Sequence, residues 1–234
     1  MRLLLKCGAQ VDSELSNAYT PLHIASKYGY LDLVKEFICH GAYLAKFASD
    51  SKGRCVQPIH MAAENNHLEV VQTLIEAGAD INATREYLSR NGVTALHLAV
   101  VKNYLDTVRL LVDMGASVDC QDDEGTTPLH LVARGGFKEM ADLLLKGGAI
   151  KDVGSSSKQS HNQTPLHFSV RFKNYEVAQL LIEAGCDINA TEKMVISPAH
   201  TKTSLFSQGL CSINKLIFCI NFFEVIVIVI VCSS

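Results

Sequence analysis

The sequence predicts an all-α solenoid, a row of stacked antiparallel helix pairs, and three observations lead to this fold class. A tetrapeptide Thr-Pro-Leu-His, or a close variant of it, occurs five times at steps of 37, 37, 33 and 37 residues. A glycine follows 21 residues after the start of each copy, so a block of constant length alternates with a connector of variable length. Apolar residues inside each block recur at helical spacing, and such self-similarity is typical of repeat proteins. The blocks are residues 20–41, 57–78, 94–115, 127–148 and 164–185.

A short helix is expected at the start of each block. Threonine before proline starts a helix, because the hydroxyl accepts a hydrogen bond from an early backbone N–H and proline fits the first turn. The second and fourth residues after the block start are always apolar, as Leu22 and Ile24 are in the first block. A glycine or polar residue near the ninth position then ends a helix of about two turns. The threonines expected to cap these helices are Thr20, Thr94, Thr127 and Thr164.

A second helix is expected in the second half of each block. The residues 14, 17 and 18 positions after the block start are apolar, as Val34, Phe37 and Ile38 are in the first block. This spacing places them on one face of a helix. The closing glycine supplies the positive φ that ends it. One such helix pair cannot bury its own apolar faces, so each pair must stack on its neighbours.

The blocks resemble the ankyrin-repeat family. They contain its T-P-L-H-x-A motif, a leucine-rich second helix and, at Gly78–Asn82, the sequence G-A-D-I-N. The resemblance covers residues 1–192. It implies a curved stack in which each connector is a β-hairpin finger, and a concave face of fingers and first helices that binds another protein.

Both ends of the chain depart from the complete block. Gly8 lies 33 residues before Gly41, so residues 1–9 correspond to the end of a half repeat. We therefore expect the natural array to continue upstream. Residues 193–234 keep neither the apolar stripe nor the closing glycine, and they form a divergent hydrophobic tail.

The apolar run Leu216–Cys232 within this tail has two interpretations. Its 17 residues are at the lower limit of a membrane-spanning helix, and Glu224 lies near its middle. Val225–Val231 consists only of β-branched residues, which favour a strand. The run is therefore either a tail anchor in a membrane or a strand, a packed extension or a non-native tail.

Composition and charge exclude several classes of function. The net charge of −3 is too near neutral to indicate nucleic-acid binding. The eight cysteines form no C-x-x-C pair, so neither a zinc site nor a disulfide framework is expected. Reduced thiols, and an N-terminus without the apolar run of a signal peptide, indicate a cytoplasmic protein. We expect it to be a monomer.

No pattern in the sequence supports catalysis, a cofactor or a bound metal, so an enzyme is not expected. The chain lacks nucleotide-binding glycine motifs, the H-E-x-x-H motif of zinc proteases and a nucleophile elbow. The family resemblance implies that the repeated histidines are one repeat apart, roughly 10 Å, which is too far to share a zinc ion bonded at about 2 Å. The family resemblance implies instead that each braces its capping residue and nearby backbone. These histidines are His23, His60, His97, His130 and His167.

The repeat register selects the residues expected to contact a protein partner. Positions 7 and 8 after each block start should lie near the concave face, and the connectors should border it. Among these residues we select aromatic and arginine side chains, which contribute most to binding at interfaces. They are Tyr28, Arg134, Arg171 and Phe172 from the first helices, and Arg54, Arg85 and Tyr87 from the connectors.

Asn82 and Asn189 share one position in the repeat, the asparagine of D-I-N. Some members of the ankyrin-repeat family are hydroxylated at the matching asparagine, so the resemblance implies hydroxylation at both. 

The sequence as a whole predicts a non-catalytic adaptor or scaffold that binds a protein on its concave face. The alternative is a membrane-tethered ankyrin protein, or a truncated cytosolic piece of a larger ankyrin-containing channel or receptor.

Overall fold

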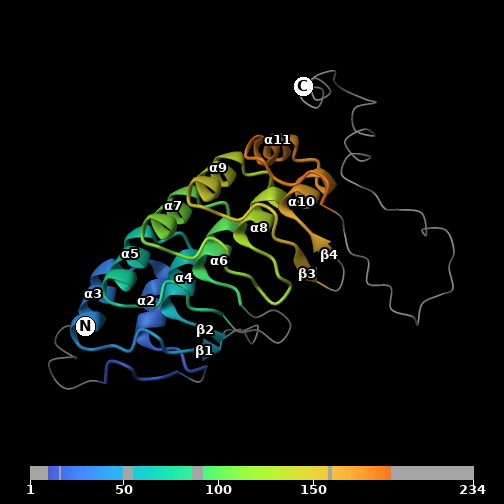
Figure 1. Cartoon of the computed structure of the whole chain (residues 1–234). Helices are drawn as coiled ribbons and strands as arrows, with labels where there is room; N and C mark the ends of the chain where they lie inside the picture. Colours follow the sequence, from blue (N-terminus) through green and yellow to red (C-terminus); the bar gives the residue numbers. More distant parts are fainter. Residues whose placement is uncertain (1–9, 16, 50–54, 86–91, 158–159, 191–234) are drawn as a thin grey trace, which may run out of the picture.

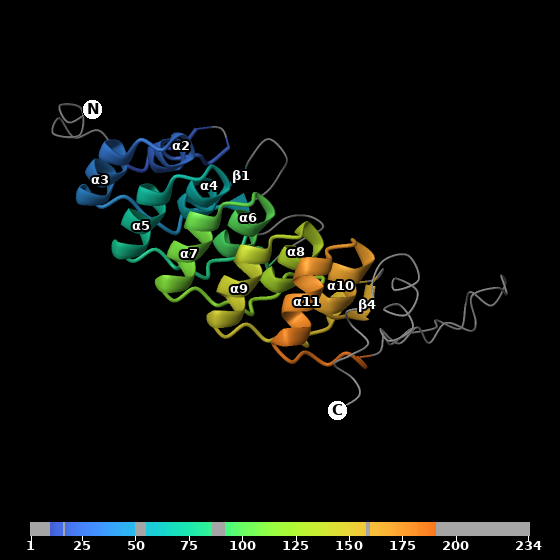
Figure 2. The ribbon, with the colours of Figure 1, turned by 90° about the horizontal axis from the view of Figure 1, so that it is seen from above.

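The structure is a computed structural model that describes residues 10–15, 17–49, 55–85, 92–157 and 160–190. In this part of the chain, five helix pairs stack along one axis (Figure 1). The first helices form one row and the second helices a parallel row, as the view from above shows (Figure 2). The predicted all-α solenoid of helix pairs is confirmed.

Each first helix begins directly after the predicted capping position and contains seven or eight residues. Each second helix contains nine residues. The first helices are α2 (Pro21–Tyr28), α4 (Pro58–Glu64), α6 (Ala95–Val101), α8 (Pro128–Gly135) and α10 (Pro165–Arg171). The second helices are α3 (Leu31–Cys39), α5 (Leu68–Glu76), α7 (Leu105–Asp113), α9 (Lys138–Lys146) and α11 (Tyr175–Glu183).

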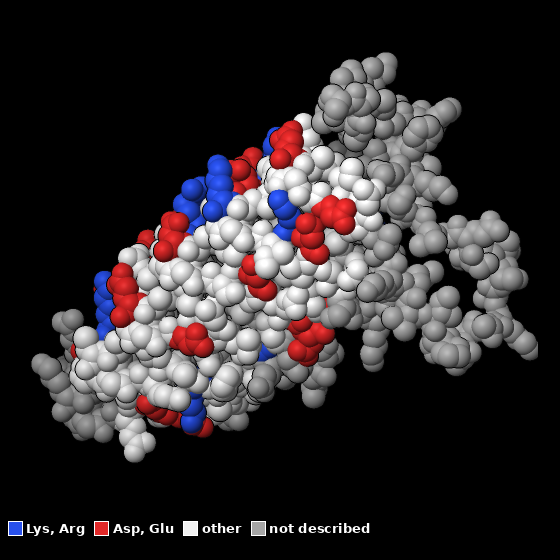
Figure 3. Space-filling view, in the orientation of Figure 1, with Lys and Arg blue, Asp and Glu red and all other residues white. Residues whose placement is uncertain are grey.

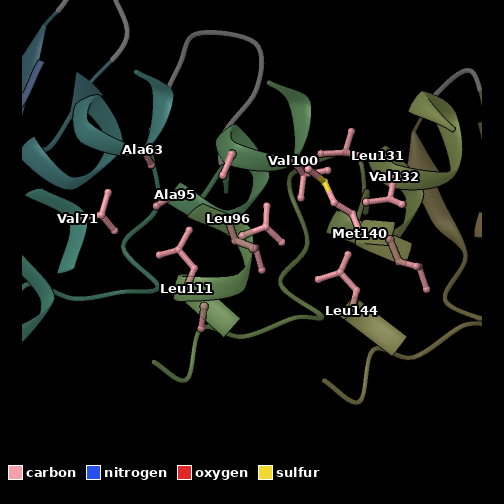
Figure 4. Close-up of a cluster of buried hydrophobic side chains, with 14 of the residues drawn as sticks. Ala63, Val71, Ala95, Leu96, Val100, Leu111, Leu131, Val132, Met140 and Leu144 are labelled. Atoms are coloured by element: carbon pink, nitrogen blue, oxygen red, sulfur yellow. The ribbon is translucent and has the colours of Figure 1, made fainter. Parts of the chain in front are cut away.

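The hydrophobic core lies between the two rows of helices. Leu96 of α6 and Leu111 of α7 are both almost completely buried, and so is Leu144 of α9. Figure 4 shows these side chains in one cluster with Val132 and Met140. Removing this apolar surface from water drives the stacking, because a single helix pair would leave one face exposed.

Neighbouring first helices contact each other more extensively than neighbouring second helices do. Small buried residues permit this close approach, as Ala25, Ala62 and Ala99 do in α2, α4 and α6. Larger apolar residues such as Phe37 and Leu74 occupy the second row. Closer packing in the first row favours curvature of the stack toward that side.

The connectors project beside the row of first helices (Figure 1). Antiparallel pairing occurs in the long connectors, residues 43–56, 80–93 and 150–163. In the described part of residues 80–93 it is a single bridge between Arg85 and Val93. The short connector 117–126 closes instead in a turn, where the N–H of Asp122 donates to the carbonyl of Thr126. A long connector has enough residues for its two halves to pair as antiparallel strands, whereas the short connector does not. The paired strands are β1 (Ala48–Ser49) with β2 (Cys55–Val56), and β3 (Ser155–Ser157) with β4 (Ser160–Gln163).

The loop between the helices of a pair contains one residue with positive φ. Glycine takes this position in two repeats, with φ of 74° at Gly29 and 75° at Gly136. The other repeats place Asn66, Asn103 and Lys173 there, with φ of 62°, 60° and 61°. Asparagine tolerates the left-handed region better than most L-residues, because its short side chain can hydrogen-bond to nearby backbone. Lysine has no such stabilisation. The last loop therefore carries the greatest backbone strain of the five.

Replacing Lys173 by glycine is expected to raise the free energy of unfolding by about 1 kcal/mol, because glycine adopts positive φ without a Cβ penalty. Urea unfolding followed by circular dichroism measures the change. Gly136→Ala is the opposite control and should destabilise the protein, since the new Cβ would lie 2.6 Å from Oδ1 of Asn174. Equal stability of Lys173→Gly and the unmodified chain would contradict the prediction.

The half repeat, residues 1–9, and the hydrophobic tail, residues 193–234, lie outside the described residues. The two interpretations of Leu216–Cys232 therefore stay predictions, as does the domain boundary near residue 192. Among the helices that the structure describes, none combines the length and the apolar composition needed to cross a membrane.

Candidate partner-binding surface

The repeated histidine joins the first helices α2, α4, α6 and α8 to a connector. In all five copies the backbone N–H of the capping residue donates to Nδ1 of the histidine, at 3.1 Å from Thr127 to His130. Because Nδ1 accepts this bond, Nε2 carries the proton, and in His130 it donates to the carbonyl of Gln163 at 2.9 Å. The same Nε2 contact joins His23 to Val56, His60 to Ala83 and His97 to Thr126.

Burial keeps the imidazole rings of His23, His60 and His130 neutral. Desolvation lowers the pKa of His23, and it lowers the pKa of His60 and of His130 to about 4. A neutral ring offers one donor and one acceptor, which are the two groups that the brace uses. The rings therefore hold the connectors in place beside the first helices.

The last turn of the first helices and the residue that follows it expose side chains along one side of the stack. Tyr28 is 56% exposed, Val101 52% and Phe172 46%, and both Arg134 and Arg171 are exposed as well. Helices that pack side by side are about 8–10 Å apart, so these side chains follow one another at that interval. We call this set the exposed row, and its members are Lys27, Tyr28, Asn65, Val101, Lys102, Arg134, Arg171 and Phe172.

Cations lie against the aromatic rings at both ends of the exposed row. Nζ of Lys27 is 5.5 Å from the centroid of the Tyr28 ring, and Cζ of Arg171 is 6.0 Å from that of Phe172. The Tyr28 ring also stacks on Tyr30, with centroids 5.9 Å apart. Such contacts hold large rings in defined positions on the surface. The row thus places all four first-helix residues selected from the sequence on one surface.

The connector residues selected from the sequence lie differently. The side chain of Arg85 is only 13% exposed, and its Nη1 is 3.5 Å from Oε2 of Glu64 in the last turn of α4. This ion pair ties the connector to the first helix. Arg54 and Tyr87 lie outside the described residues.

One exposed aromatic residue, Tyr30, was not among the predicted partner contacts, because these were taken from positions 7 and 8 of each block. Tyr30 is 52% exposed and lies beside Tyr28. In the next repeat the same position is His67, whose Nε2 donates to the carbonyl of Lys27 at 2.9 Å. In the last repeat it is Asn174, which donates to the carbonyl of Ala133. This position is covered where a described repeat precedes it, and Tyr30 has no such neighbour among the described residues.

The short connector 117–126 carries four acidic residues, and two of them, Asp119 and Asp122, accept hydrogen bonds from backbone N–H groups. Oδ1 of Asp122 accepts the N–H of Glu124 at 3.0 Å and that of Thr126 at 2.9 Å. Oδ1 of Asp119 accepts the N–H of Ile150 at 2.8 Å. These carboxylates shape the turn and link it to the next repeat.

Comparison with known families decides what this arrangement of repeats is. The family described as ankyrin repeats matches residues 1–85, 55–122 and 114–192 in three overlapping copies. The chain belongs to the ankyrin-repeat family. Ankyrin repeats are in general protein–protein interaction modules and are typically non-catalytic.

Two curated relatives are similar to parts of the chain. The probable 26S proteasome regulatory subunit p28 of Saccharomyces cerevisiae is 32% identical over 101 residues, which are 42% of this chain and 43% of that protein. The putative ankyrin repeat protein FPV222 of Fowlpox virus is 27% identical over 92 residues, which are 39% of this chain and 12% of that protein. The similarity thus spans less than half the length of each of these relatives.

In these ankyrin repeats, the position shared by Asn82 and Asn189 lies at a junction between repeats. Oδ1 of Asn82 accepts the N–H of Ser117 in the next repeat at 2.8 Å. Asp119, at the same position one repeat later, makes the equivalent bond described above. Both asparagines are exposed, and the N–H of Asn189 donates to Oδ1 of Asp187 at 2.9 Å.

Metal-binding and thiol chemistry have little support in the described ankyrin repeats. No group of three or more His, Cys, Asp or Glu residues in this part of the chain is placed to hold a metal ion. The described cysteines Cys39, Cys55, Cys120 and Cys186 are free thiols. Burial raises the pKa of Cys120, and it raises the pKa of Cys186 to about 11, so both remain protonated and weakly nucleophilic near neutral pH.

Proposed function

We propose that this ankyrin-repeat chain is a non-catalytic adaptor or scaffold that binds a protein partner on the concave face formed by the fingers and the first helices. The exposed row carries this proposal. Its aromatic and arginine side chains stand on helices held by a continuous core, so little conformational freedom is lost when a partner binds. Side chains of these types dominate the binding energy of interfaces.

The proposed anchors are Tyr28 and Phe172, with Arg134 and Arg171 beside them. Arg85 would contribute less, because a partner must compete with the ion pair to Glu64. Arg54 and Tyr87 are proposed contacts on the basis of the sequence. The yeast relative is named as a probable regulatory subunit of a larger assembly, and such a role accords with binding rather than catalysis.

Site-specific photo-cross-linking in cells tests this function. Benzoylphenylalanine would replace Tyr28 or Phe172 on the proposed face, and Lys35 or Asp113 on the second helices. All four positions are exposed. We expect discrete protein adducts from the first two positions and none of comparable yield from the other two. Equal yields from both faces, or no adduct from Tyr28 and Phe172, would refute a concave binding face.

We also propose hydroxylation at Asn82 and Asn189, which rests on the family resemblance and on their exposure. Protein purified from cells should show peptides 16 Da heavier, the mass of one oxygen, at each asparagine. The matched control is Asn82→Asp. The aspartate can still accept the N–H of Ser117, and the peptide that is 16 Da heavier should no longer be found. Fully unmodified peptides in cellular protein would remove this proposal.

We further propose that the chain is a cytoplasmic monomer. The four described free thiols support a reducing compartment. The second helices, which we call the acidic outer row, contain ten acidic and four basic residues, and this excess supports a monomer because like charges repel. Light scattering should give one species of 25.5 kDa, and a mass twice as large would contradict the monomer.

A further inference from the structure

The two rows of helices carry opposite net charge. The second helices contain four basic and ten acidic residues, a net charge of −6. The first helices contain three basic residues and one acidic residue, a net charge of +2, and the loops after them add Lys102 and Lys173. Figure 3 shows charges of both signs along the edge that the second helices form in Figure 1. The exposed row is therefore a basic strip on a chain whose net charge is −3.

The acidic residues near this strip leave its positive charge in excess. The acidic residue of the first helices, Glu64, is paired with Arg85. In the short connector, the carboxylates of Asp119 and Asp122 accept backbone N–H groups. Asp123 and Glu124 are the other two acidic residues of this connector, whereas the strip has four basic residues and Lys173 follows directly after it. The four are Lys27, Lys102, Arg134 and Arg171.

Alternate repeats place a basic residue next to an exposed apolar one. The second and fourth repeats contribute Asn65 and Arg134 instead. Because neighbouring helices lie about 8–10 Å apart, successive apolar side chains are about 20 Å apart along the strip. The basic–apolar pairs are Lys27 with Tyr28, Lys102 with Val101, and Arg171 with Phe172.

We propose that the partner presents an extended acidic segment with apolar side chains about six residues apart. The inference rests on the proposed function and names the chemistry of its partner. Carboxylates would pair with Lys102, Arg134 and Arg171, and the apolar side chains would pack beside Tyr28, Val101 and Phe172. A run of like charges repels itself and stays extended. At about 3.3 Å per residue, six residues span the ~20 Å between successive apolar positions.

A synthetic peptide tests this proposal. The probe has about 18 residues of glutamate and serine, with three leucines six residues apart and a fluorescein label. One twin carries lysine in place of glutamate, and another carries serine in place of leucine. Fluorescence polarisation with the full chain should show the acidic leucine peptide binding at least tenfold more tightly than either twin. Its affinity should fall severalfold between about 50 and 300 mM NaCl, because salt screens exposed charges.

The matched comparison is between charge-reversal variants on the first helices and on the second helices. Arg134→Glu with Arg171→Glu should weaken binding of the acidic peptide at least tenfold. Lys35→Glu with Arg109→Glu makes the same change in net charge at exposed sites on α3 and α7, and it should keep the affinity within about twofold. Equal losses in the two variants, or no binding of the acidic peptide at about 1 mM, would overturn the proposal. Tighter binding of a single-stranded oligonucleotide of about 20 bases would also overturn it.

The photo-cross-linking experiment separates this inference from the proposed function. Adducts at Tyr28 and Phe172 without a preference for the acidic peptide would leave a protein-binding face and reject an acidic partner segment. Failure of both experiments would reject both proposals.

Discussion

Truncation of Leu111 to alanine is expected to lower the free energy of unfolding by about 2–5 kcal/mol. The Leu111 side chain is 0% exposed and lies in the central repeat, in the cluster that Figure 4 shows. Alanine leaves a cavity there, and the surrounding side chains lose dispersion contacts that water cannot replace. Urea unfolding followed by circular dichroism measures the loss.

The control for Leu111→Ala is the same substitution at an exposed leucine. Leu15 is 60% exposed, so Leu15→Ala removes the same atoms with an expected effect within about 0.5 kcal/mol. Each repeat contacts only its neighbours, so a cavity in the third repeat should also weaken the coupling between the two halves of the stack. Similar losses at Leu111 and Leu15 would show that the core between the rows does not hold the stack together.

Acidification from pH 6.5 to about 4 is expected to lower the free energy of unfolding by roughly 3 kcal/mol for each of His60 and His130. Burial lowers the pKa of both rings from 6.5 to about 4 in the folded chain. Below pH 6.5 the unfolded chain therefore binds protons that the folded chain does not, and stability falls with pH. The stabilisation is fully present above pH 6.5, and His23, whose pKa is also lowered, adds to the loss in the same direction.

Urea unfolding at several pH values between 7.5 and 4 checks this dependence. His130→Gln should lose stability at pH 7.5, because its bonds to Thr127 and Gln163 change, and its stability should depend less steeply on pH. Leu111→Ala is the matched comparison, since it destabilises the chain without removing a titrating group and should keep the original slope. A free energy of unfolding that stays constant between pH 6.5 and 4.5 would contradict the prediction.

Much of the fold could be predicted because its determinants are local in the sequence. Thr127 and Pro128 start α8, and Gly148 closes the block after α9, within one block of the chain. The apolar spacing inside that block needs no knowledge of the neighbours. Tyr28, Arg134, Arg171 and Phe172 could be placed on one surface for the same reason, since their register repeats with the helices.

The rest depended on contacts between residues that are far apart in the chain. Arg85 was selected as a partner contact, but its exposure is set by Glu64 in α4. Tyr30 was not selected, because the selection used positions 7 and 8 of the block. Its exposure depends on the neighbouring repeat, since the equivalent His67 is covered and donates to the carbonyl of Lys27. The strands of the connectors likewise depend on whether two segments have room to pair.

By itself, the sequence determined the helix pair, its length and its fivefold repetition, because capping, spacing and glycine placement act within about twenty residues. Only the tertiary structure decided which side chains remain available to a partner, and that the basic strip and the acidic outer row lie on different rows of helices. Exposure and electrostatic surroundings arise where one repeat stacks against the next, and a pattern within a single repeat does not contain them.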